Sequence, residues 1–263
     1  ERVEEYLNKI FSLYSIMGGV MQQYFSDTPL VVGQEYIFNK DQAHHAKNVV
    51  RLHHEKIRLV YDGIGYFADA YNKGKDFVAM VLEEDERINE IGVEVTLAMG
   101  LIRKEKFELV LQKACELGVT RIVPFESMRC VVRAKKEKED KQQARRIDIL
   151  QEAAEQCKRN RIPEITPIVQ LQDLVNYRSD VNVLPYENAY SKSKFMTEIL
   201  SPGQSVTFVI GPEGGFAPEE VEFLKQNGFE AITLGKRILR AETAAMYACA
   251  VISEQNEAHE NML

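Results

Sequence analysis

The sequence predicts an α/β protein in which a mainly parallel sheet follows a small N-terminal β-barrel domain. From about residue 93 onward, short apolar runs alternate with helical patterns, which is typical of parallel strands joined by crossover helices. Before residue 93 most signals are short strands separated by hairpin turns. The length of 263 residues suits one small domain attached to one of ordinary size.

Four segments are expected: an N-terminal extension over residues 1–20, the barrel over 21–92, the α/β domain over 93–257 and a tail over 258–263. The barrel is expected to end shortly after the charged, apolar-poor segment 83–87. The extension places its apolar residues on one helical stripe and predicts an amphipathic helix. Gly18 and Gly19 lie just before Met21. A purine-rich ribosome-binding site, if it were translated in frame, would encode two glycines just before the true first residue. We therefore expect Met21 to be the natural first residue.

Three barrel strands are expected over residues 56–62, 65–71 and 76–82. They are separated by Asp62-Gly63 and by the turn 72–75, and both sequences are typical of hairpins. Asn39 with Gln42 three residues later predicts a capping box, which begins a helix that continues through Val50.

The α/β domain is expected to consist of alternating strands and helices. The expected strands cover residues 93–99, 120–125, 165–169, 181–184, 206–210 and 231–234. The expected helices cover residues 106–117, 141–158, from 218 to the Asn227-Gly228 stop, and 242–257.

Two glycine loops near the end of the chain mark the expected functional site. The strands 206–210 and 231–234 are joined by the helix that begins at Pro218, so they should be parallel. The loops that follow them, Gly211 to Gly215 and Leu234 to Arg240, then emerge at the same edge of the sheet. Ligands bind at this edge in open parallel sheets, and glycines let backbone amides approach a ligand closely.

Composition excludes several other classes of protein. No apolar run is long enough to cross a bilayer, and the four scattered cysteines form no CxxC pair. We therefore expect a cytoplasmic protein with reduced thiols and no metal site; the histidine pairs 44–45 and 53–54 are adjacent and do not share a face. The net charge is −7, yet residues 129–161 hold eleven lysines and arginines against six acidic residues. This basic segment is either a solvated helix face or an RNA contact.

The chain resembles the bacterial uracil-N3 methyltransferases of 16S ribosomal RNA, which belong to the SPOUT class of S-adenosylmethionine enzymes. The resemblance runs from Met21 to the last helix and is most specific in the two loop motifs. These motifs are Val209-Ile-Gly-Pro-Glu-Gly-Gly-Phe216 and Leu234-Gly-Lys-Arg-Ile-Leu-Arg-Ala-Glu-Thr-Ala244. Further similar motifs are Gln112-Lys113, Glu116-Leu-Gly118, Glu155-Gln156 and Arg161-Ile-Pro163.

This resemblance implies a SPOUT-type knotted sheet, a PUA-like RNA-binding barrel, a homodimer, S-adenosylmethionine as cofactor, and 16S ribosomal RNA or the small ribosomal subunit as partner. It also implies a set of cofactor-binding residues: Leu184, Pro185, Gly211, Pro212, Glu213, Gly214, Gly215, Leu234, Gly235, Ile238, Leu239, Arg240, Thr243 and Ala244. The implied RNA-binding residues are Arg51, Arg129, Arg133, Arg159 and Arg161. The chain departs from the family pattern at Gln22 to Phe25, at Met128, and at Lys158, where a glycine is usual.

Arg240 is the leading catalytic candidate, because methylation of uracil N3 develops negative charge that a guanidinium can hold. Its alternative role is a salt bridge that anchors the last helix. Glu242 is either a general base or, as we favour, a carboxylate stabilised at the start of that helix. Glu213 either faces the cofactor or caps the helix that begins at Pro218.

Two other functions remain open. A SPOUT enzyme that methylates the ribose 2′-hydroxyl would share the knot, although the PUA-like barrel and the sequence from Arg240 to Thr243 argue against it. A noncatalytic ribosome-assembly factor would bind RNA through both domains, but the intact glycine loops speak against this function.

Overall fold

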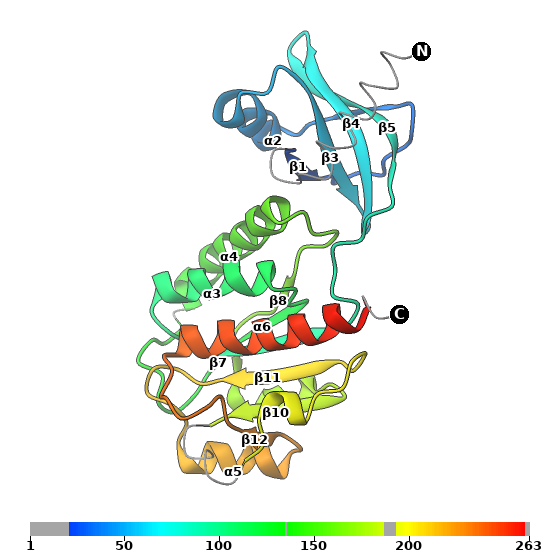
Figure 1. The fold of residues 1–263 in the computed structure, drawn as a ribbon. Coiled ribbons are helices and arrows are strands. Elements are labelled where there is room, and N and C mark those ends of the chain that lie inside the picture. The colour runs from blue at the N-terminus through cyan, green and yellow to red at the C-terminus, as the bar shows by residue number, and fades with distance from the viewer. Residues whose placement is uncertain (1–20, 135, 187–192, 261–263) are drawn as a thin grey trace. The chain divides into compact units, whose positions relative to one another are not determined.

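The computed structural model describes residues 21–134, 136–186 and 193–260. These residues form two compact units (Figure 1). The first runs to Asn89 and also takes in Lys158–Arg161, and the second takes Glu90–Cys157 and the chain from Ile162 onward. The expected helix in residues 1–20, and with it the question of a start at Met21, lies outside the described residues, as does the end of the expected tail.

The first unit is a mixed five-stranded sheet with the order β1-β3-β4-β5-β2. Its strands are β1 Gln23–Phe25, β2 Glu35–Ile37, β3 His54–Tyr61, β4 Ile64–Lys73 and β5 Asp76–Asp85. The three expected strands are confirmed as β3, β4 and β5, which pair antiparallel. The pairing of β1 with β3 is parallel. A parallel pair needs a long crossover, and the intervening chain provides it with β2 and a helical segment.

The helical segment of the first unit begins as its sequence predicts. Asn39 is the N-cap of α2 (Lys40–His44), and its side chain accepts a hydrogen bond from the backbone N–H of Gln42 at 2.9 Å. The chain continues as a π-helix, His45–Val50. The expected capping box is only half formed, because the Gln42 side chain instead bonds the hydroxyl of Tyr36 and the backbone oxygen of Phe25.

A buried guanidinium holds the two parts of the first unit together. Arg58 on β3 is 2% exposed, and its Nε donates to Asp85 Oδ2 at 2.7 Å. Its Nη1 donates to Gln23 Oε1 at 2.8 Å and to the carbonyl of Lys158 at 3.2 Å, and its Nη2 donates to Asn160 Oδ1 at 3.3 Å. The segment Lys158–Arg161 is therefore fixed to the sheet from within the unit.

The first unit explains the residues found at two positions of the sequence, Asp85 and Lys158. The first unit runs to Asn89, shortly after the charged segment 83–87; within that segment β5 continues to Asp85, which is buried as the partner of Arg58. Lys158 has a φ of 65°, a conformation that favours glycine, and it stands where the family pattern has a glycine.

The second unit contains a parallel sheet with the order β12-β10-β11-β6-β7-β8, to which β9 adds beside β7. Its strands are β6 Val95–Gly100, β7 Arg121–Glu126, β8 Glu164–Ile165, β9 Val169–Gln170, β10 Val181–Pro185, β11 Val206–Ile210 and β12 Glu230–Ile232. Its α-helices are α3 Lys104–Glu116, α4 Lys136–Gln156, α5 Pro218–Gln226 and α6 Ala241–Glu260. Helices α4 and α6 both pack against α3 (Figure 1). Helix α5 packs against η2, a 3-10 helix over Leu171–Tyr177.

The α/β prediction is confirmed in its main features, with three differences. The strand expected over 165–169 is two short strands, β8 and β9, which both pair with β7 and flank Pro167. Helix α4 begins at Lys136, earlier than expected. The terminal strands β11 and β12 are not neighbours, because β10 lies between them and pairs parallel with both.

None of the helices within the described ranges is long and apolar enough to span a membrane. In the same part of the chain, no group of three or more His, Cys, Asp or Glu side chains is arranged to hold a metal ion.

Candidate cofactor site

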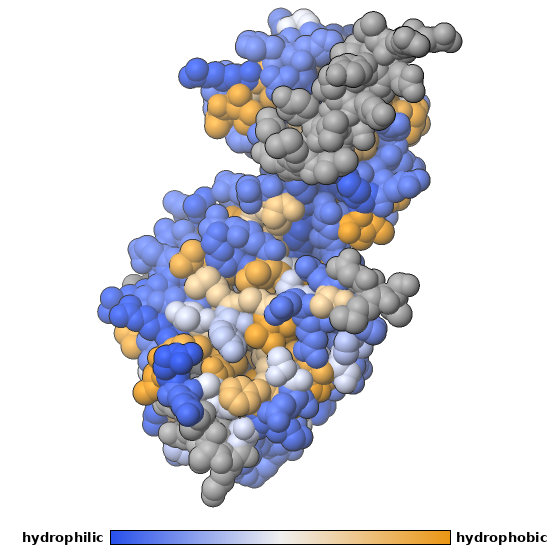
Figure 2. All heavy atoms as spheres, in the orientation of Figure 1, coloured by the Kyte–Doolittle hydropathy of each residue, from blue (hydrophilic) through white to orange (hydrophobic). Residues whose placement is uncertain are grey.

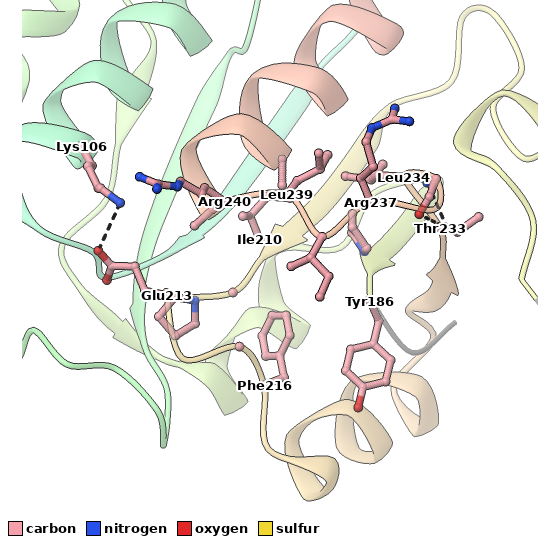
Figure 3. Close-up of a pocket in the computed structure, with 18 residues that line it drawn as sticks. Lys106, Tyr186, Ile210, Glu213, Phe216, Thr233, Leu234, Arg237, Leu239 and Arg240 are labelled. Atoms are coloured by element: carbon pink, nitrogen blue, oxygen red, sulfur yellow. Dashed lines mark hydrogen bonds and ion pairs between the residues drawn. The ribbon is translucent and has the colours of Figure 1, made fainter. Parts of the chain in front are cut away.

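A cavity of about 410 Å³ lies where three parallel strands end. The strands are β10, β11 and β12, and the residues that follow each of them line the cavity (Figure 3). The cavity is lined by Lys106, Pro185, Tyr186, Ile210, Gly211, Pro212, Glu213, Gly215, Phe216, Thr233, Leu234, Gly235, Arg237, Ile238, Leu239, Arg240, Ala241 and Ala244. The two glycine loops thus meet as the sequence predicts, because β10 brings β11 and β12 to the same edge of the sheet.

Eleven of the expected cofactor-binding residues line this cavity, and three do not. Leu184 is completely buried, one residue before Pro185. Thr243 is exposed on the first turn of α6. Gly214 contacts another loop of the protein.

The glycines of the first loop are needed for packing within the protein. A Cβ on Gly211 would lie 2.9 Å from the Phe216 ring, and a Cβ on Gly214 would lie 2.6 Å from the backbone oxygen of Arg129. Gly215 has a φ of 66° and closes a turn by donating its N–H to the carbonyl of Pro212 at 2.9 Å. Packing within the protein therefore already requires glycine at Gly211 and Gly214, and close approach to a ligand stays a prediction for this loop.

Sequence reasoning missed Gly100, the last residue of β6. A Cβ at this position would lie 2.7 Å from the backbone nitrogen of Pro212, which lines the cavity. The local sequence does not distinguish Gly100 from other glycines, because its contact with Pro212 arises only when β6 pairs with β11.

Gly100→Ala is expected to weaken S-adenosylmethionine binding by about tenfold or more, because overpacking against backbone costs about 1–3 kcal/mol and here displaces a cavity-lining loop. Titration calorimetry measures the affinity, and a thermal scan shows that the variant is folded. Unchanged affinity in a folded variant would show that the loop tolerates the displacement.

The second loop is shaped by Thr233 and Gly235. Thr233 Oγ1 accepts the N–H of Gly235 at 3.1 Å, and Gly235 has a φ of 108°. The side chains that follow are well exposed, with Ile238 at 83%. This loop therefore presents apolar and basic groups to solvent at the mouth of the cavity.

Arg240 lies at the end of the second loop with an exposed side chain. Figure 3 shows its guanidinium on the same side of the cavity as Lys106 and Glu213, whereas Arg237 points away from that side. Within the described part of the chain, Arg240 forms no ion pair with a carboxylate at 4.0 Å or less. Its charge still helps to lower the pKa of Glu242 in the first turn of α6, so a longer-range link to that helix stands beside its place in the cavity lining.

Lys106 organises two carboxylates at this edge of the site. Its Nζ lies 3.1 Å from Glu242 Oε1 and 3.8 Å from Glu213 Oε1. Burial raises the pKa of Glu242, but its own backbone N–H, Lys106 and Arg240 outweigh burial and hold the pKa below its ordinary value. Glu242 therefore holds a proton only weakly, which fits a helix-start carboxylate better than a general base.

The structure also separates the two roles considered for Glu213. Glu213 lines the cavity beside Lys106. The backbone N–H of Ala217, at the start of α5, is instead bonded by Glu220 Oε2 at 2.8 Å. Lys106 itself was not predicted; the signal was its position in the first turn of α3, directly after β6.

The expected RNA-binding arginines lie in both units. Arg51 is exposed in the first unit and ends the π-helix with a φ of 63°. Arg129, Arg133 and Arg161 are exposed, whereas Arg159 is 3% exposed. A buried guanidinium is poorly placed to contact phosphate, so the position of Arg159 argues against its expected role.

Known proteins resemble this chain along most of its length. Residues 89–253 match the RNA methyltransferase domain family. The ribosomal RNA small subunit methyltransferase E of Bacillus subtilis is 32% identical over 250 residues, which cover 90% of this chain and 98% of that protein.

Two solved structures contain the cofactor. The small subunit methyltransferase E of Neisseria gonorrhoeae, bound to S-adenosyl methionine, superposes with a TM-score of 0.80 at 32% identity and covers 88% of this chain and 96% of its own. A methyltransferase of Legionella pneumophila with bound SAM has a TM-score of 0.81 at 30% identity and the same two coverages. The matched domain, the relatives and the paired loops agree, and the chain belongs to the ribosomal RNA small subunit methyltransferase E family, with a SPOUT-type methyltransferase domain.

Proposed function

We propose that this protein transfers a methyl group from S-adenosylmethionine to N3 of a specific uridine in 16S ribosomal RNA. One observation carries the proposal: a single cavity is lined by the Gly211 to Gly215 loop and by the Leu234 to Arg240 loop. Relatives at about this level of similarity hold S-adenosylmethionine in their structures. The residues present fit this cofactor, because an apolar wall that includes Phe216 and Leu239 lies beside polar backbone of both loops.

S-adenosylmethionine supplies an electrophilic methyl group. The reaction breaks the bond between sulfur and the methyl carbon, joins that carbon to N3, and releases the N3 proton to an acceptor. Arg240 stabilises the negative charge that develops on the uracil, since a guanidinium stays protonated and donates several hydrogen bonds. Lys106 pairs with Glu242 and Glu213 at the edge of the site, and the lowered pKa of Glu242 argues against this carboxylate as the proton acceptor.

The RNA substrate is expected to contact exposed arginines of both units, including Arg51, Arg129 and Arg161. A paired uracil hides N3 in a hydrogen bond, so the target base is unpaired or turned out of its helix. A ribosomal RNA substrate also places the enzyme in the cytoplasm. The trefoil knot implied by the family concerns the path of the chain through its own loops and stays a prediction.

We further propose that the protein is a homodimer. Figure 2 shows apolar side chains gathered on one face of the second unit. Leu109 on α3 and Tyr247 on α6 are 39% and 43% exposed, and α3 packs against α6. Exposed apolar patches of this kind commonly mark interfaces.

Light scattering after gel filtration is expected to give twice the chain mass of 30.1 kDa. Tyr247→Asp should shift the protein toward the monomer, because it places a charge in the apolar face. Ile64→Asp in the first unit, where the residue is 46% exposed, serves as a control. A monomeric wild type would refute the dimer.

The direct test incubates small ribosomal subunits from a methylation-deficient strain with the protein and labelled S-adenosylmethionine. Mapping of the modified nucleoside should give 3-methyluridine. Label on a ribose hydroxyl would support the other SPOUT activity. Absence of S-adenosylmethionine binding by calorimetry would instead support the noncatalytic assembly factor.

A further inference from the structure

A compact loop carries two of the exposed arginines of the second unit. It follows β7 and runs from Ser127 to Ala134, and we call it the arginine loop. Arg133 fixes it from within, because its Nη1 and Nη2 donate to the backbone oxygens of Ser127 and Met128, both at 3.0 Å. The N–H of Ala134 is bonded by Glu126 Oε1 at 2.6 Å. The guanidinium of Arg133 is thus occupied in shaping the loop.

Glu220 ties the arginine loop to the cofactor site. It lies in the first turn of α5 and is 5% exposed. One carboxylate oxygen, Oε2, accepts the N–H of Ala217 at 2.8 Å and caps the helix. The other, Oε1, accepts the N–H of Met128 at 2.7 Å, although Met128 is far away in the chain. A buried carboxylate is stable only when such donors satisfy it, so Glu220 holds both the start of α5 and the backbone of Met128 in place.

A second contact joins the same loop to the glycine loop. The Gly214 Cα lies so close to Arg129 that an added Cβ would be 2.6 Å from its backbone oxygen and 3.0 Å from its Cβ. Glu220 and Gly214 therefore hold the backbone on both sides of the Met128–Arg129 peptide. The Arg129 side chain is exposed, and within the described residues its guanidinium has neither a hydrogen bond nor an ion pair.

From this arrangement we propose that Glu220 is a positioning residue for RNA: it holds the arginine loop against the cofactor loop so that Arg129 meets the RNA backbone beside the methyl-transfer site. The inference rests on the proposed function. It assigns Arg129 as the phosphate contact and Arg133 as its internal support. It also makes the carboxylate of Glu220, which touches neither substrate, a determinant of RNA affinity.

Glu220→Gln tests the idea, because an amide has one acceptor oxygen for two N–H donors and its NH2 group repels the second. Glu219→Gln is the matched control, since Glu219 is exposed on the same helical turn and loses the same charge. We expect Glu220→Gln to raise the Kd and KM for the small subunit about tenfold, as misplacement by about 1 Å can cost up to about 10²-fold. The Kd for S-adenosylmethionine and the kcat should change less than about twofold, and Glu219→Gln should match the wild type.

A double-mutant cycle identifies Arg129 as the group through which Glu220 acts. Arg129→Ala should weaken RNA binding in the wild type and have little further effect in Glu220→Gln, because the loop is already displaced. Additive losses in RNA affinity would overturn the inference. If Glu220→Gln is not folded, Glu220→Asp, which keeps the charge on a shorter side chain, is measured in the same cycle.

The outcomes separate this inference from the proposed function. A wild-type protein that neither binds S-adenosylmethionine nor methylates the subunit refutes the function. A wild-type protein that is active, beside a Glu220→Gln variant with unchanged RNA affinity, overturns the role of Glu220 alone. A loss of cofactor affinity equal to the loss of RNA affinity would show that Glu220 is only a helix cap.

Discussion

Arg240→Ala is expected to lower kcat/KM about 10²–10³-fold, the usual loss when a preorganised group that stabilises developing charge is removed. Arg240 lines the cavity, is exposed, and has no ion-pair partner within the described ranges. Its charge is therefore available to the uracil as the N3 proton leaves. Single-turnover methylation of small subunits measures the effect.

Two variants show whether the geometry of the guanidinium matters. Arg240→Lys keeps a positive charge but loses the planar fork, so it should recover only part of the activity. Arg237→Ala removes a second arginine of the same loop, whose side chain points away from Lys106 and Glu213 (Figure 3), and should cost little. Equal activity of Arg240→Ala and the wild type would contradict a catalytic role for Arg240.

Asp85→Ala is expected to lower the free energy of unfolding of the first unit by about 3–5 kcal/mol, because it leaves the Arg58 charge buried without its partner. The two side chains are 3% and 2% exposed and 2.7 Å apart. Urea unfolding followed by circular dichroism measures the loss. Glu83→Ala is the control, since Glu83 is an exposed carboxylate on the same strand.

The same pair predicts how stability depends on pH. Burial raises the pKa of Asp85, but hydrogen bonds from Arg87 and Arg58 outweigh burial and hold it below its ordinary value. A carboxylate with a lowered folded-state pKa stabilises the fold above its unfolded pKa, near 3.9, and this contribution is lost as pH falls through the folded pKa. The wild type should therefore lose stability below about pH 4, and Asp85→Ala should lose less over the same range. An identical acid dependence in both proteins would contradict the assignment.

The sequence was sufficient to predict the two loops that line the cavity. Pro218 and Asn227-Gly228 predict the two ends of α5 to within one residue. Because this helix joins two buried apolar strands, the strands are expected to be parallel. The strand neighbours were not predictable, because periodicity reports burial and not order. Lys106 and Gly100 went unnoticed for this reason. Lys106 lines the cavity, and Gly100 packs against Pro212 of its lining, only because β6 lies beside β11.

Asp85 shows a different limit of sequence reasoning. Its neighbours in the chain are charged and exposed, so the local pattern gives no sign that this carboxylate is buried. Only Arg58, 27 residues away, makes this carboxylate part of a buried pair. Local patterns cannot reveal a polar residue whose partner lies on another strand.

The hydrogen bond between Arg58 and Asn160 spans 102 positions of the chain. During synthesis the first sheet emerges from the ribosome long before the amide that completes it. An N-terminal fragment ending at Asn89 would keep Asp85 and Gln23 beside this guanidinium but would lack the Lys158 carbonyl and the Asn160 amide. The first unit is therefore completed only after α4 has been translated.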